Sequence, residues 1–362
     1  MDRRSFITKA ALGGTTAAVA GTLAAPIYAQ GKRTLTLVTT WGRGAAGVHD
    51  SAERAANLIT EMTDGELTID LKAAGELVGA FEVFDAVSSG QADAYHGADY
   101  YWVNQHPAYA FYTCVPMGMT SLEMINWYYH DGGAALHDEL NSIFGLKGFL
   151  AGNTGMQGGG WFRQEINSPA DFNGLKFRMP GLGGQALGRL GASVQNIPGG
   201  EVYQALSSGA LDGTEWIGPW ADEKMGFQEI TKIYYTAGFH EPQAALSLTF
   251  NADVFDSFTP AQQKIVEIAC GNTHQWNLGQ FHANHGAALD RLRAGGVKTL
   301  EFGDDVWDAF ARVAKEVLDE NMGDDLFARI RTSHDDSLKR SAAWLSQGEG
   351  QYHAQRARIL GA

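Results

Sequence analysis

The sequence is poor in positive charge. Its 362 residues include 27 Lys and Arg against 41 Asp and Glu, so the formal net charge at pH 7 is −14. An acidic surface repels nucleic acid and anionic lipid, and we therefore expect neither as a partner. It also means that an anionic ligand needs a specific positive group placed to receive it.

Cysteine is almost absent, with only Cys114 and Cys270 in the chain. Two cysteines allow one disulfide in an oxidising compartment. Each lies among apolar residues, which favours two buried free thiols and leaves the bridge as the alternative.

The common catalytic motifs are also missing. There is no HExxH, CxxC or GxSxG pattern and no evident pairing of a nucleophile with a base. Residues 181–186 (GLGGQA) match a dinucleotide fingerprint, with Glu201 about 20 residues on. Because Glu201 begins a helix of its own in the repeat described below, we interpret these glycines as a strand-to-helix turn. We therefore expect neither an organic cofactor nor an enzyme.

Long apolar runs are missing as well. The run at residues 10–25 is too short and too rich in Gly and Thr to span a bilayer, and nothing later comes closer. It follows residues 3–7 (RRSFI), the core of a twin-arginine signal, and precedes a cleavage point after Ala29. We predict that residues 1–29 are a twin-arginine signal peptide and that the mature protein works in the periplasm.

The sequence does contain an internal repeat. Residues 82–93 (EVFDAVSSGQAD) and 201–212 (EVYQALSSGALD) are identical at seven of twelve positions. Each copy predicts a short helix that ends at a Gly and is followed by a strand. A period this long excludes a solenoid and favours two similar α/β lobes with a cleft between them, as in a hinged ligand clamp. An ordinary helix–Gly–strand connection is the alternative.

The wider pattern alternates strands with helices, which predicts an α/β fold with mostly parallel sheets. Apolar positions predict strands at 35–38, 67–71, 175–180 and 246–250, and helices at 48–62 and 306–317. Thr259 followed by Pro260 begins a helix that continues to Arg293. At 1.5 Å per residue this helix is about 50 Å long and can contact both lobes.

A few polar residues lie where they could bind a ligand. Arg178 is in an otherwise apolar strand, and its planar guanidinium suits a carboxylate; an internal salt bridge is the alternative. Glu215, Glu241 and Gln157 offer hard oxygen ligands for Na⁺ or Ca²⁺, unless the carboxylates pair with basic residues. For the histidines at 274, 282 and 285, a solvated helix face is favoured over a zinc site.

These residues lie in segments that resemble a known family. Residues 170–180 (ADFNGLKFRMP), 201–203 (EVY) and 212–215 (DGTE) resemble the DctP-type substrate-binding receptors of TRAP transporters. Residues 152–157 (GNTGMQ), 160–163 (GWFR) and 215–219 (EWIGP) are similar to its TakP-like 2-oxoacid receptor branch. The resemblance covers essentially the whole chain.

The resemblance implies a two-lobed periplasmic-binding-protein clamp with a long helix spanning both lobes and C-terminal helices. Lobe I would comprise residues 30–153 plus 244–284, and lobe II residues 154–243 plus 285–362. The implied ligand is a small organic acid, a 2-oxo or 2-hydroxy monocarboxylate. The implied partners are the small and large membrane permease subunits, with a second copy of the chain as a possible dimer partner.

The resemblance also implies roles for individual residues. Arg178 would bind the ligand carboxylate. A bridging cation, Na⁺ or Ca²⁺, would be held by Gln157, Glu215, the backbone carbonyl of Trp216 and Glu241. The remaining ligand-binding residues would be Asn153, Trp216, Tyr100 and Tyr101.

This chain departs from the family pattern at two places. Phe239 and His240 stand where the pattern has two tryptophans, and Asp99 stands where it has a glycine. The alternatives are a receptor for a different acid or polar solute, or a periplasmic metal-dependent hydrolase or lyase. The last would need a water-activating base and an open metal position, for which the sequence gives no pattern.

Overall fold

The computed structural model describes residues 31–361, so the predicted signal peptide at 1–29 lies outside the described residues. Within residues 31–361, every helix is too short or too polar to cross a bilayer. Residues 32–361 belong to one unit, and the lobe boundaries given above stay a prediction.

One sheet, sheet A, has the strand order β2-β1-β3-β10-β4. Its strands are β1 (Arg33–Thr39), β2 (Leu67–Lys72), β3 (Ala94–Gly97), β4 (Leu146–Asn153) and β10 (Ala245–Asn251). Leu35 and Leu37 of β1 are buried, as alternation in a strand against a core requires. The strands predicted at 35–38, 67–71 and 246–250 are therefore observed.

The other sheet, sheet B, has the order β11-β9-β5-β8-β6-β7. Its strands are β5 (Gly160–Phe162), β6 (Lys176–Arg178), β7 (Ser193–Gln195), β8 (Gly213–Thr214), β9 (Ile233–Tyr235) and β11 (Lys298–Leu300). The predicted strand at 175–180 is β6, and Gly181 (φ +63°) begins the next helix directly after it. The glycines at 181–184 thus form the expected strand-to-helix turn.

The helices fall between and after these strands. They are α1 (Val48–Met62), α2 (Val83–Ser88), α3 (Ser121–His130), α4 (Gly133–Ser142), α5 (Gly181–Arg189), α6 (Gly199–Ser207), α7 (Pro219–Met225), α8 (Ala252–Asp256), α9 (Pro260–Ala294), α10 (Asp304–Glu320), α11 (Asp325–Leu345) and α12 (Gln351–Leu360). Short 3-10 turns are η1 (Asp99–Trp102), η2 (Pro107–Tyr112), η3 (Pro169–Phe172) and η4 (Phe227–Glu229), and a π turn is η5 (Ser346–Gly350).

The two copies of the internal repeat have the same local structure in different sheets. The first copy forms α2, a turn at Gly90 (φ +78°) and then β3 of sheet A. The second forms α6, a turn at Gly209 (φ +79°) and then β8 of sheet B. Glycine occupies this left-handed turn in both copies because other residues are strained there.

The sheets are less parallel than the sequence predicts. Within residues 31–361, five of the nine strand pairings are parallel, and the four antiparallel ones involve β10 or β5. Both strands follow a direct passage of the chain from one sheet to the other, at residues 154–159 and 236–244, without an intervening helix. A strand's direction depends on such passages, which local sequence patterns do not encode.

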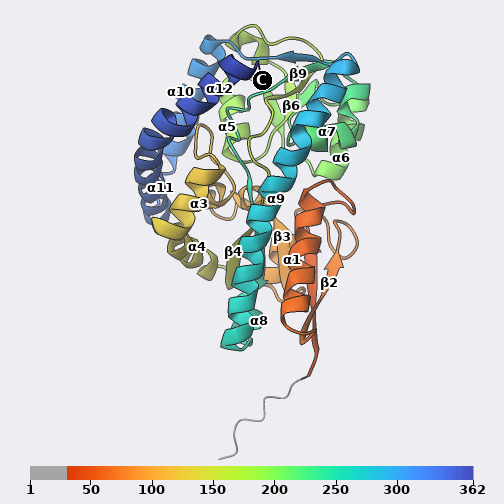
Figure 1. Ribbon diagram of the computed structural model, residues 1–362, viewed down its shortest axis with the longest axis vertical. Coiled ribbons are helices and arrows are strands. Elements are labelled where there is room, and N and C mark those ends of the chain that lie inside the picture. The colour runs from red at the N-terminus through yellow and green to blue at the C-terminus, as the bar shows by residue number, and fades with distance from the viewer. Residues whose placement is uncertain (1–30, 362) are drawn as a thin grey trace, which may run out of the picture. The chain divides into compact units, whose positions relative to one another are not determined.

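The long helix α9 packs on β4 of sheet A and on α1 and α7, the helices that follow β1 of sheet A and β8 of sheet B, as it runs from α8 past α1 to α7 (Figure 1). Its predicted N-cap is observed, since the Thr259 hydroxyl accepts a hydrogen bond from the Gln262 amide. The amide side chain of Asn277 bonds the Gly47 carbonyl beside α1, and farther along Arg291 forms an ion pair with Glu223 of α7. The helix therefore ties the two sheets together.

Burial settles two further expectations. Cys114 and Cys270 are both buried free thiols, as favoured from the sequence. The prediction of a solvated face for the α9 histidines is wrong for His274, which is 2% exposed and bonded to Asn153. That stretch of α9 is covered because it packs on β4.

Candidate ligand and cation site

The two passages between the sheets lie side by side and carry polar side chains. The Gln157 amide nitrogen donates to the Glu241 carbonyl at 3.2 Å, and the Gly238 amide donates to the Gln157 carbonyl at 3.0 Å. These reciprocal backbone bonds place Gln157 beside Glu241, and both side chains are buried. Two of the predicted cation ligands are thus neighbours, although 84 positions separate them in the sequence.

Arg178 and Glu215 meet at one edge of sheet B. Arg178 ends β6, and Glu215 follows β8, the parallel neighbour of β6. Because parallel strands end at the same edge, the two side chains come together and form a buried ion pair between Nη1 and Oε1. Arg178 Nε also donates to the Ile197 carbonyl at 3.3 Å, and its guanidinium carbon lies 5.4 Å from the Trp216 ring centre.

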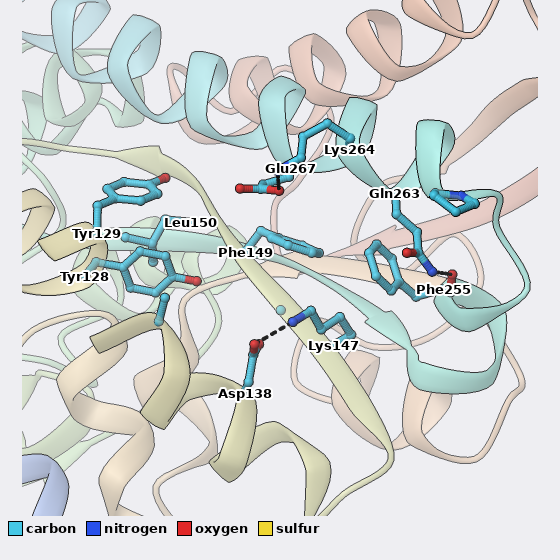
Figure 2. A pocket seen from close by; sticks show the side chains of 13 residues that line it. Tyr128, Tyr129, Asp138, Lys147, Phe149, Leu150, Phe255, Gln263, Lys264 and Glu267 are labelled. Atoms are coloured by element: carbon cyan, nitrogen blue, oxygen red, sulfur yellow. Dashed lines mark hydrogen bonds and ion pairs between the residues drawn. The ribbon is translucent and has the colours of Figure 1, made fainter. Parts of the chain in front are cut away.

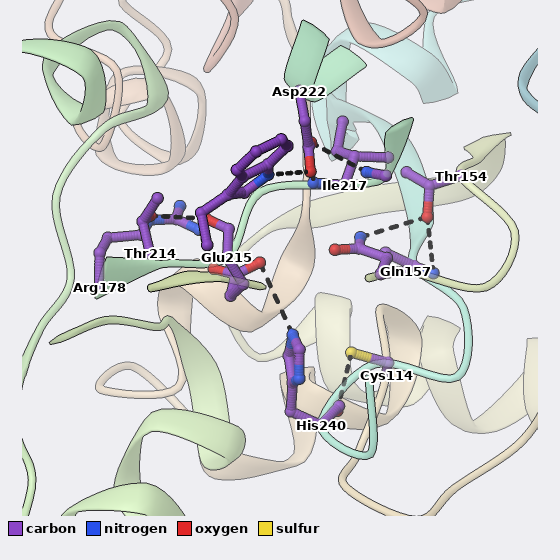
Figure 3. Close-up of polar contacts among 12 residues, drawn as sticks. Cys114, Thr154, Gln157, Arg178, Thr214, Glu215, Ile217, Asp222 and His240 are labelled. Carbon is purple, nitrogen blue, oxygen red and sulfur yellow. Dashed lines mark hydrogen bonds and ion pairs between the residues drawn. The ribbon is translucent and has the colours of Figure 1, made fainter. Parts of the chain in front are cut away.

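The side chains of the two passages and the Arg178–Glu215 ion pair belong to one buried cluster (Figure 3). Glu215, His240 and Glu241 each offer a ligand atom, and these atoms lie within 4.8 Å of one another. His240 Nε2 is 3.8 Å from Glu215 Oε2. Three groups that can bind a metal ion therefore converge from β8 and from the passage at 236–244.

Several polar atoms of this cluster lack a hydrogen-bond partner anywhere in residues 31–361. They are Arg178 Nη2, Glu215 Oε2, Gln157 Oε1, Glu241 Oε2 and both ring nitrogens of His240. An unpaired polar atom in a protein interior costs about 1–3 kcal/mol, and native proteins seldom retain many. Their convergence indicates a place built for a polar guest. The oxygen atoms fit a hard cation, and the free guanidinium nitrogen fits a carboxylate.

The burial of the cluster perturbs its titratable groups. Burial raises the pKa of Glu241 well above its ordinary value, and the Glu215 carboxylate raises it further. For Arg178, burial acts to lower the pKa, but the Glu215 carboxylate raises it above its ordinary value overall. Burial also raises the pKa of Tyr100, with Glu241 as the next cause. Arg178 therefore stays charged.

A small cavity of about 10 Å³ adjoins the cluster, close to the room that one water molecule takes. Tyr100, Tyr101 and Trp216, all predicted to bind ligand, line it together with Gln157. A wider hollow of about 230 Å³ shares Trp41 and Trp216 with this cavity. Residues of the wider hollow include Gly42, which follows β1 of sheet A, and Gly199, which begins α6 between β7 and β8 of sheet B.

The structure places Asn153 outside this cavity. Its side-chain amide donates to Gln243 Oε1 at 2.7 Å, and its Oδ1 accepts from the Gly155 amide at 2.8 Å. The side chain is thus engaged in holding the start of the passage at 154–159. Its predicted contact with ligand stays a prediction.

The sequence did not predict a role in the site for Asp222 or His240. Asp222 supports the site, and His240 is part of the cluster. Asp222 accepts hydrogen bonds from the amides of Ile217 and Gly218 and from the Trp161 indole, so it fixes the loop that follows Trp216. Burial raises the pKa of Asp222 to about 7, while these donors lower it. His240 was noted only as a departure from the family pattern. A signal for Asp222 was its position in the first turn of a helix that begins with Gly218-Pro219.

A hollow of about 390 Å³ lies elsewhere in residues 31–361, between α4, β4 and the start of α9 (Figure 2). Its charged side chains are already paired, Lys147 with Asp138 and Lys264 with Glu267. None of its lining atoms is a buried polar atom without a partner. We therefore place the candidate site at the Glu215 cluster, where such atoms converge.

Comparison with known proteins decides the family. Residues 40–324 match the sequence model of the bacterial extracellular solute-binding proteins, family 7 (DctP). The chain belongs to this family. DctP proteins are the solute receptors of TRAP transporters, so the predicted family and receptor function are confirmed.

Named relatives agree with this assignment. The chain is 37% identical, over 87% of its length and 87% of the relative's, to a monocarboxylate 2-oxoacid-binding periplasmic protein of Nostoc sp.. A TRAP solute-binding protein from Pseudoalteromonas atlantica with bound sodium and pyruvate superposes with a TM-score of 0.86 at 36% identity, covering 89% of this chain and 99% of that one. One from Bordetella bronchiseptica, a dimer with copurified calcium and picolinate, has a TM-score of 0.90 at 30% identity, with 91% and 99% coverage. These matches confirm the predicted α/β solute-receptor fold.

Proposed function

We propose that this DctP receptor captures a small 2-oxo or 2-hydroxy monocarboxylate together with a bridging cation, Na⁺ or Ca²⁺. The observation that carries the proposal is the set of unpartnered atoms on Arg178, Glu215, Gln157 and Glu241 in one buried cluster. Arg178 Nη2 would bind the acid's carboxylate. Glu215 Oε2, Glu241 Oε2, Gln157 Oε1 and the Trp216 carbonyl would hold the cation against the acid's other oxygen atoms.

Charge balance supports a cation. Arg178 contributes one positive charge to the cluster and the two glutamates contribute two negative ones, so the buried groups are left with a net negative charge when both are ionised. An acid would add another. Isolated buried charges are strongly unfavourable, and a cation bound at the oxygens offsets them.

Binding requires the cavity to enlarge, because about 10 Å³ is too small for a three-carbon acid. We propose that lobe I (residues 30–153 plus 244–284) and lobe II (residues 154–243 plus 285–362) separate and close around the acid, which enters through the hollow between Trp41 and Trp216. The loaded receptor would then dock on the small and large permease subunits. The predicted signal at 1–29 would export the chain to the periplasm, where the Nostoc relative is named as working.

Catalysis is not part of this proposal. The cluster has two carboxylates and one imidazole that could activate water, so the hydrolase or lyase alternative has to be tested directly. Incubation of pyruvate, lactate or 2-oxobutyrate with the purified protein should leave each acid unchanged by NMR. Turnover of any of them would favour the enzyme.

A thermal-shift screen tests the substrate class. A ligand present at 100 times its Kd stabilises the folded protein by about 2.7 kcal/mol, which shifts the melting midpoint by several degrees. Pyruvate, lactate and 2-oxobutyrate should produce the shift in the presence of Ca²⁺ or Na⁺. Sugars should fail because they lack a carboxylate for Arg178. A screen in which only sugars or amino acids shift the midpoint would reject the proposed class.

A homodimer is also proposed, built through the C-terminal helices. Every residue of α12 in the described part is exposed, including Tyr352, Ile359 and Leu360 at 64–69% exposure. Trp344 of α11 is 73% exposed beside a hollow of about 240 Å³ that Leu122 also lines. Light scattering should give a dimer for the wild type and a monomer for Trp344→Glu. Monomeric wild-type protein would reject the proposal.

A further inference from the structure

Asp99 begins the turn η1, and its side chain is completely buried. It is one of the two places where this chain departs from the family pattern, and the proposed binding of acid and cation gives it no role. Taking a carboxyl group out of water is costly, and an apolar residue would fill the same space without that cost. The contacts of this group therefore indicate what it does.

The Asp99 carboxyl group joins η1 to two other elements of the fold. Its Oδ2 accepts a hydrogen bond from the Ser247 hydroxyl at 2.8 Å and another from His137 Nε2 at 3.1 Å. Ser247 belongs to β10 and is the register partner of Gly97, the last residue of β3. His137 belongs to α4 and is buried, with its ring stacked on Tyr112 at 4.0 Å between ring centres. Asp99 thus fastens η1 to a central strand of sheet A and to a helix.

A second hydrogen bond holds the next residue of the turn. The Tyr100 amide donates to the Thr113 hydroxyl at 3.1 Å. The Thr113 carbonyl in turn accepts from the Gln243 side chain at 2.6 Å and from the Ala245 amide at 3.1 Å. Gln243 is near the end of the passage at 236–244, and Ala245 begins β10. Both bonds therefore connect η1 to the segment that leaves this passage.

The turn presents two tyrosines to the candidate site. Tyr100 and Tyr101 line the small cavity beside the cluster. Burial raises the pKa of Tyr101, and the Arg178 guanidinium acts against this rise. Burial also raises the pKa of Glu241, and a hydrogen bond from Tyr100 acts against that rise. The turn η1, which follows β3 of sheet A, therefore brings two phenols to ligand-binding groups that other parts of the fold supply.

We propose that Asp99 is a positioning residue for acid binding, which holds the phenols of Tyr100 and Tyr101 in place from behind the turn. The inference rests on the proposed function, because it concerns the affinity of the same site. The groups of a binding site have to stay within about 0.5 Å of their productive places, and the contacts behind them provide this precision. Loss of Asp99 should therefore weaken binding without removing any group that touches the acid or the cation.

Titration calorimetry with pyruvate at saturating Ca²⁺ tests the inference on the full mature chain. Asp99→Ala should weaken pyruvate binding at least about tenfold, because the turn loses both bonds of the carboxyl group. Asp99→Asn should bind within about threefold of the wild type, since a carboxamide oxygen in the place of Oδ2 can still accept both bonds. Asp138→Ala is the matched control and should bind normally, because it removes a partly exposed carboxylate of α4 next to His137.

A double-mutant cycle separates positioning from general destabilisation. If Asp99 acts through the two phenols, Asp99→Ala should weaken pyruvate binding by less than about twofold in a chain that already carries Tyr100→Phe and Tyr101→Phe. If Asp99→Ala does not fold, Ser247→Ala replaces it in the cycle, because it removes one of the two donors and should weaken binding about threefold. A loss of the same size in both backgrounds overturns the inference, and so does an Asp99→Asn variant that binds as weakly as Asp99→Ala.

Hydrogen exchange gives a second measurement that needs no ligand. The Tyr100 amide, which is bonded to Thr113, should exchange at least about tenfold faster in Asp99→Ala or Ser247→Ala than in the wild type, while the amides of α10 keep their rates. An unchanged rate at Tyr100 overturns the inference. If pyruvate binds the wild type and Asp99→Ala equally well, only the inference fails. If no small acid binds the wild type with a cation, the proposed function fails, and the exchange rate still decides whether Asp99 holds the turn.

Discussion

Arg178 places Nη1 against Glu215 Oε1 and leaves Nη2 without a partner in residues 31–361. The sequence allowed two interpretations of this arginine, an internal salt bridge or a ligand clamp. The structure contains the salt bridge and still leaves one nitrogen free. One guanidinium can therefore fix Glu215 and bind a ligand carboxylate at the same time.

Arg178→Ala should weaken pyruvate binding by about 2–5 kcal/mol, because the ligand carboxylate would be buried without its partner. Arg178→Lys should also bind poorly, since one ammonium group cannot serve Glu215 and the ligand in the planar geometry of a guanidinium. Isothermal titration measures both. Arg189→Ala removes a surface arginine paired with Glu320 and should bind normally. A near-normal affinity for pyruvate in Arg178→Lys would contradict the proposal that one guanidinium serves both Glu215 and the ligand carboxylate.

Glu215→Gln should uncouple acid from cation. In the wild type, Ca²⁺ should tighten pyruvate binding by about 5–150-fold, the usual range for coupled sites, and pyruvate should tighten Ca²⁺ equally. The variant loses one negative charge at the cation, so this enhancement should fall below about twofold. Glu223→Gln, which affects an exposed ion pair with Arg291, is the control. Full coupling in Glu215→Gln would remove this residue from the cation site.

Gly199 tests whether the Trp216 ring must stay where it is. A methyl group at Gly199 would lie 2.1 Å from the Trp216 ring, whereas one at Gly200 would meet nothing within 4 Å. Gly199→Ala should displace the ring, cost about 1–3 kcal/mol of stability and lower pyruvate affinity. Gly200→Ala should bind normally and gain up to about 1 kcal/mol as a better helix former. Equal affinities in the two variants, measured by titration, would show that the ring position is unimportant.

Two buried histidines should lose their contribution to stability in mild acid because burial keeps them neutral, while the raised pKa values of Asp222 and Glu241 act in the opposite direction. Burial lowers the pKa of His96 and of His274 to about 4, while an unfolded histidine titrates near 6.5. Between these values an unfolded histidine binds more protons than a buried one, so each histidine's contribution to the free energy of unfolding should decrease by about 3 kcal/mol as the pH falls from 6.5 to 4. Above pH 6.5 this contribution is constant.

Urea unfolding at several pH values checks the slope. His96→Gln should remove one of the two histidine contributions from the slope, because Gln can still accept the hydrogen bond that the Trp41 indole donates but does not titrate. His353→Gln, at an exposed position, should keep the wild-type slope. An identical slope in His96→Gln would show that His96 is not responsible.

Much of the fold could be predicted because its signals are local. The repeat ends in the same glycine turn twice, and Thr259 with Pro260 marks the start of α9. The directions of β5 and β10 could not be predicted, since they depend on where the chain passes between sheets. That is a property of the whole topology, which no short window of sequence contains.

The candidate site likewise has residues that the sequence predicted and features that it could not predict. Gln157, Arg178, Glu215 and Glu241 were singled out from their residue types and positions and given roles by the family resemblance, and the structure brings them together. Asn153 does not line the cavity, and its side-chain amide instead donates a hydrogen bond to Gln243. These two residues are 90 positions apart, so local sequence patterns do not predict the bond. The position of His240 beside Glu215 and Glu241 depends on three-dimensional packing, which no short window of sequence contains.

The most direct measurement is the titration of wild-type protein with pyruvate, first in chelated, sodium-free buffer and then with a saturating cation. The account predicts one acid per chain, bound with the cation and at least fivefold more weakly without it. Pyruvate affinity that is the same in both buffers would contradict the central claim, because the acid would then be held by Arg178 without a bridging ion.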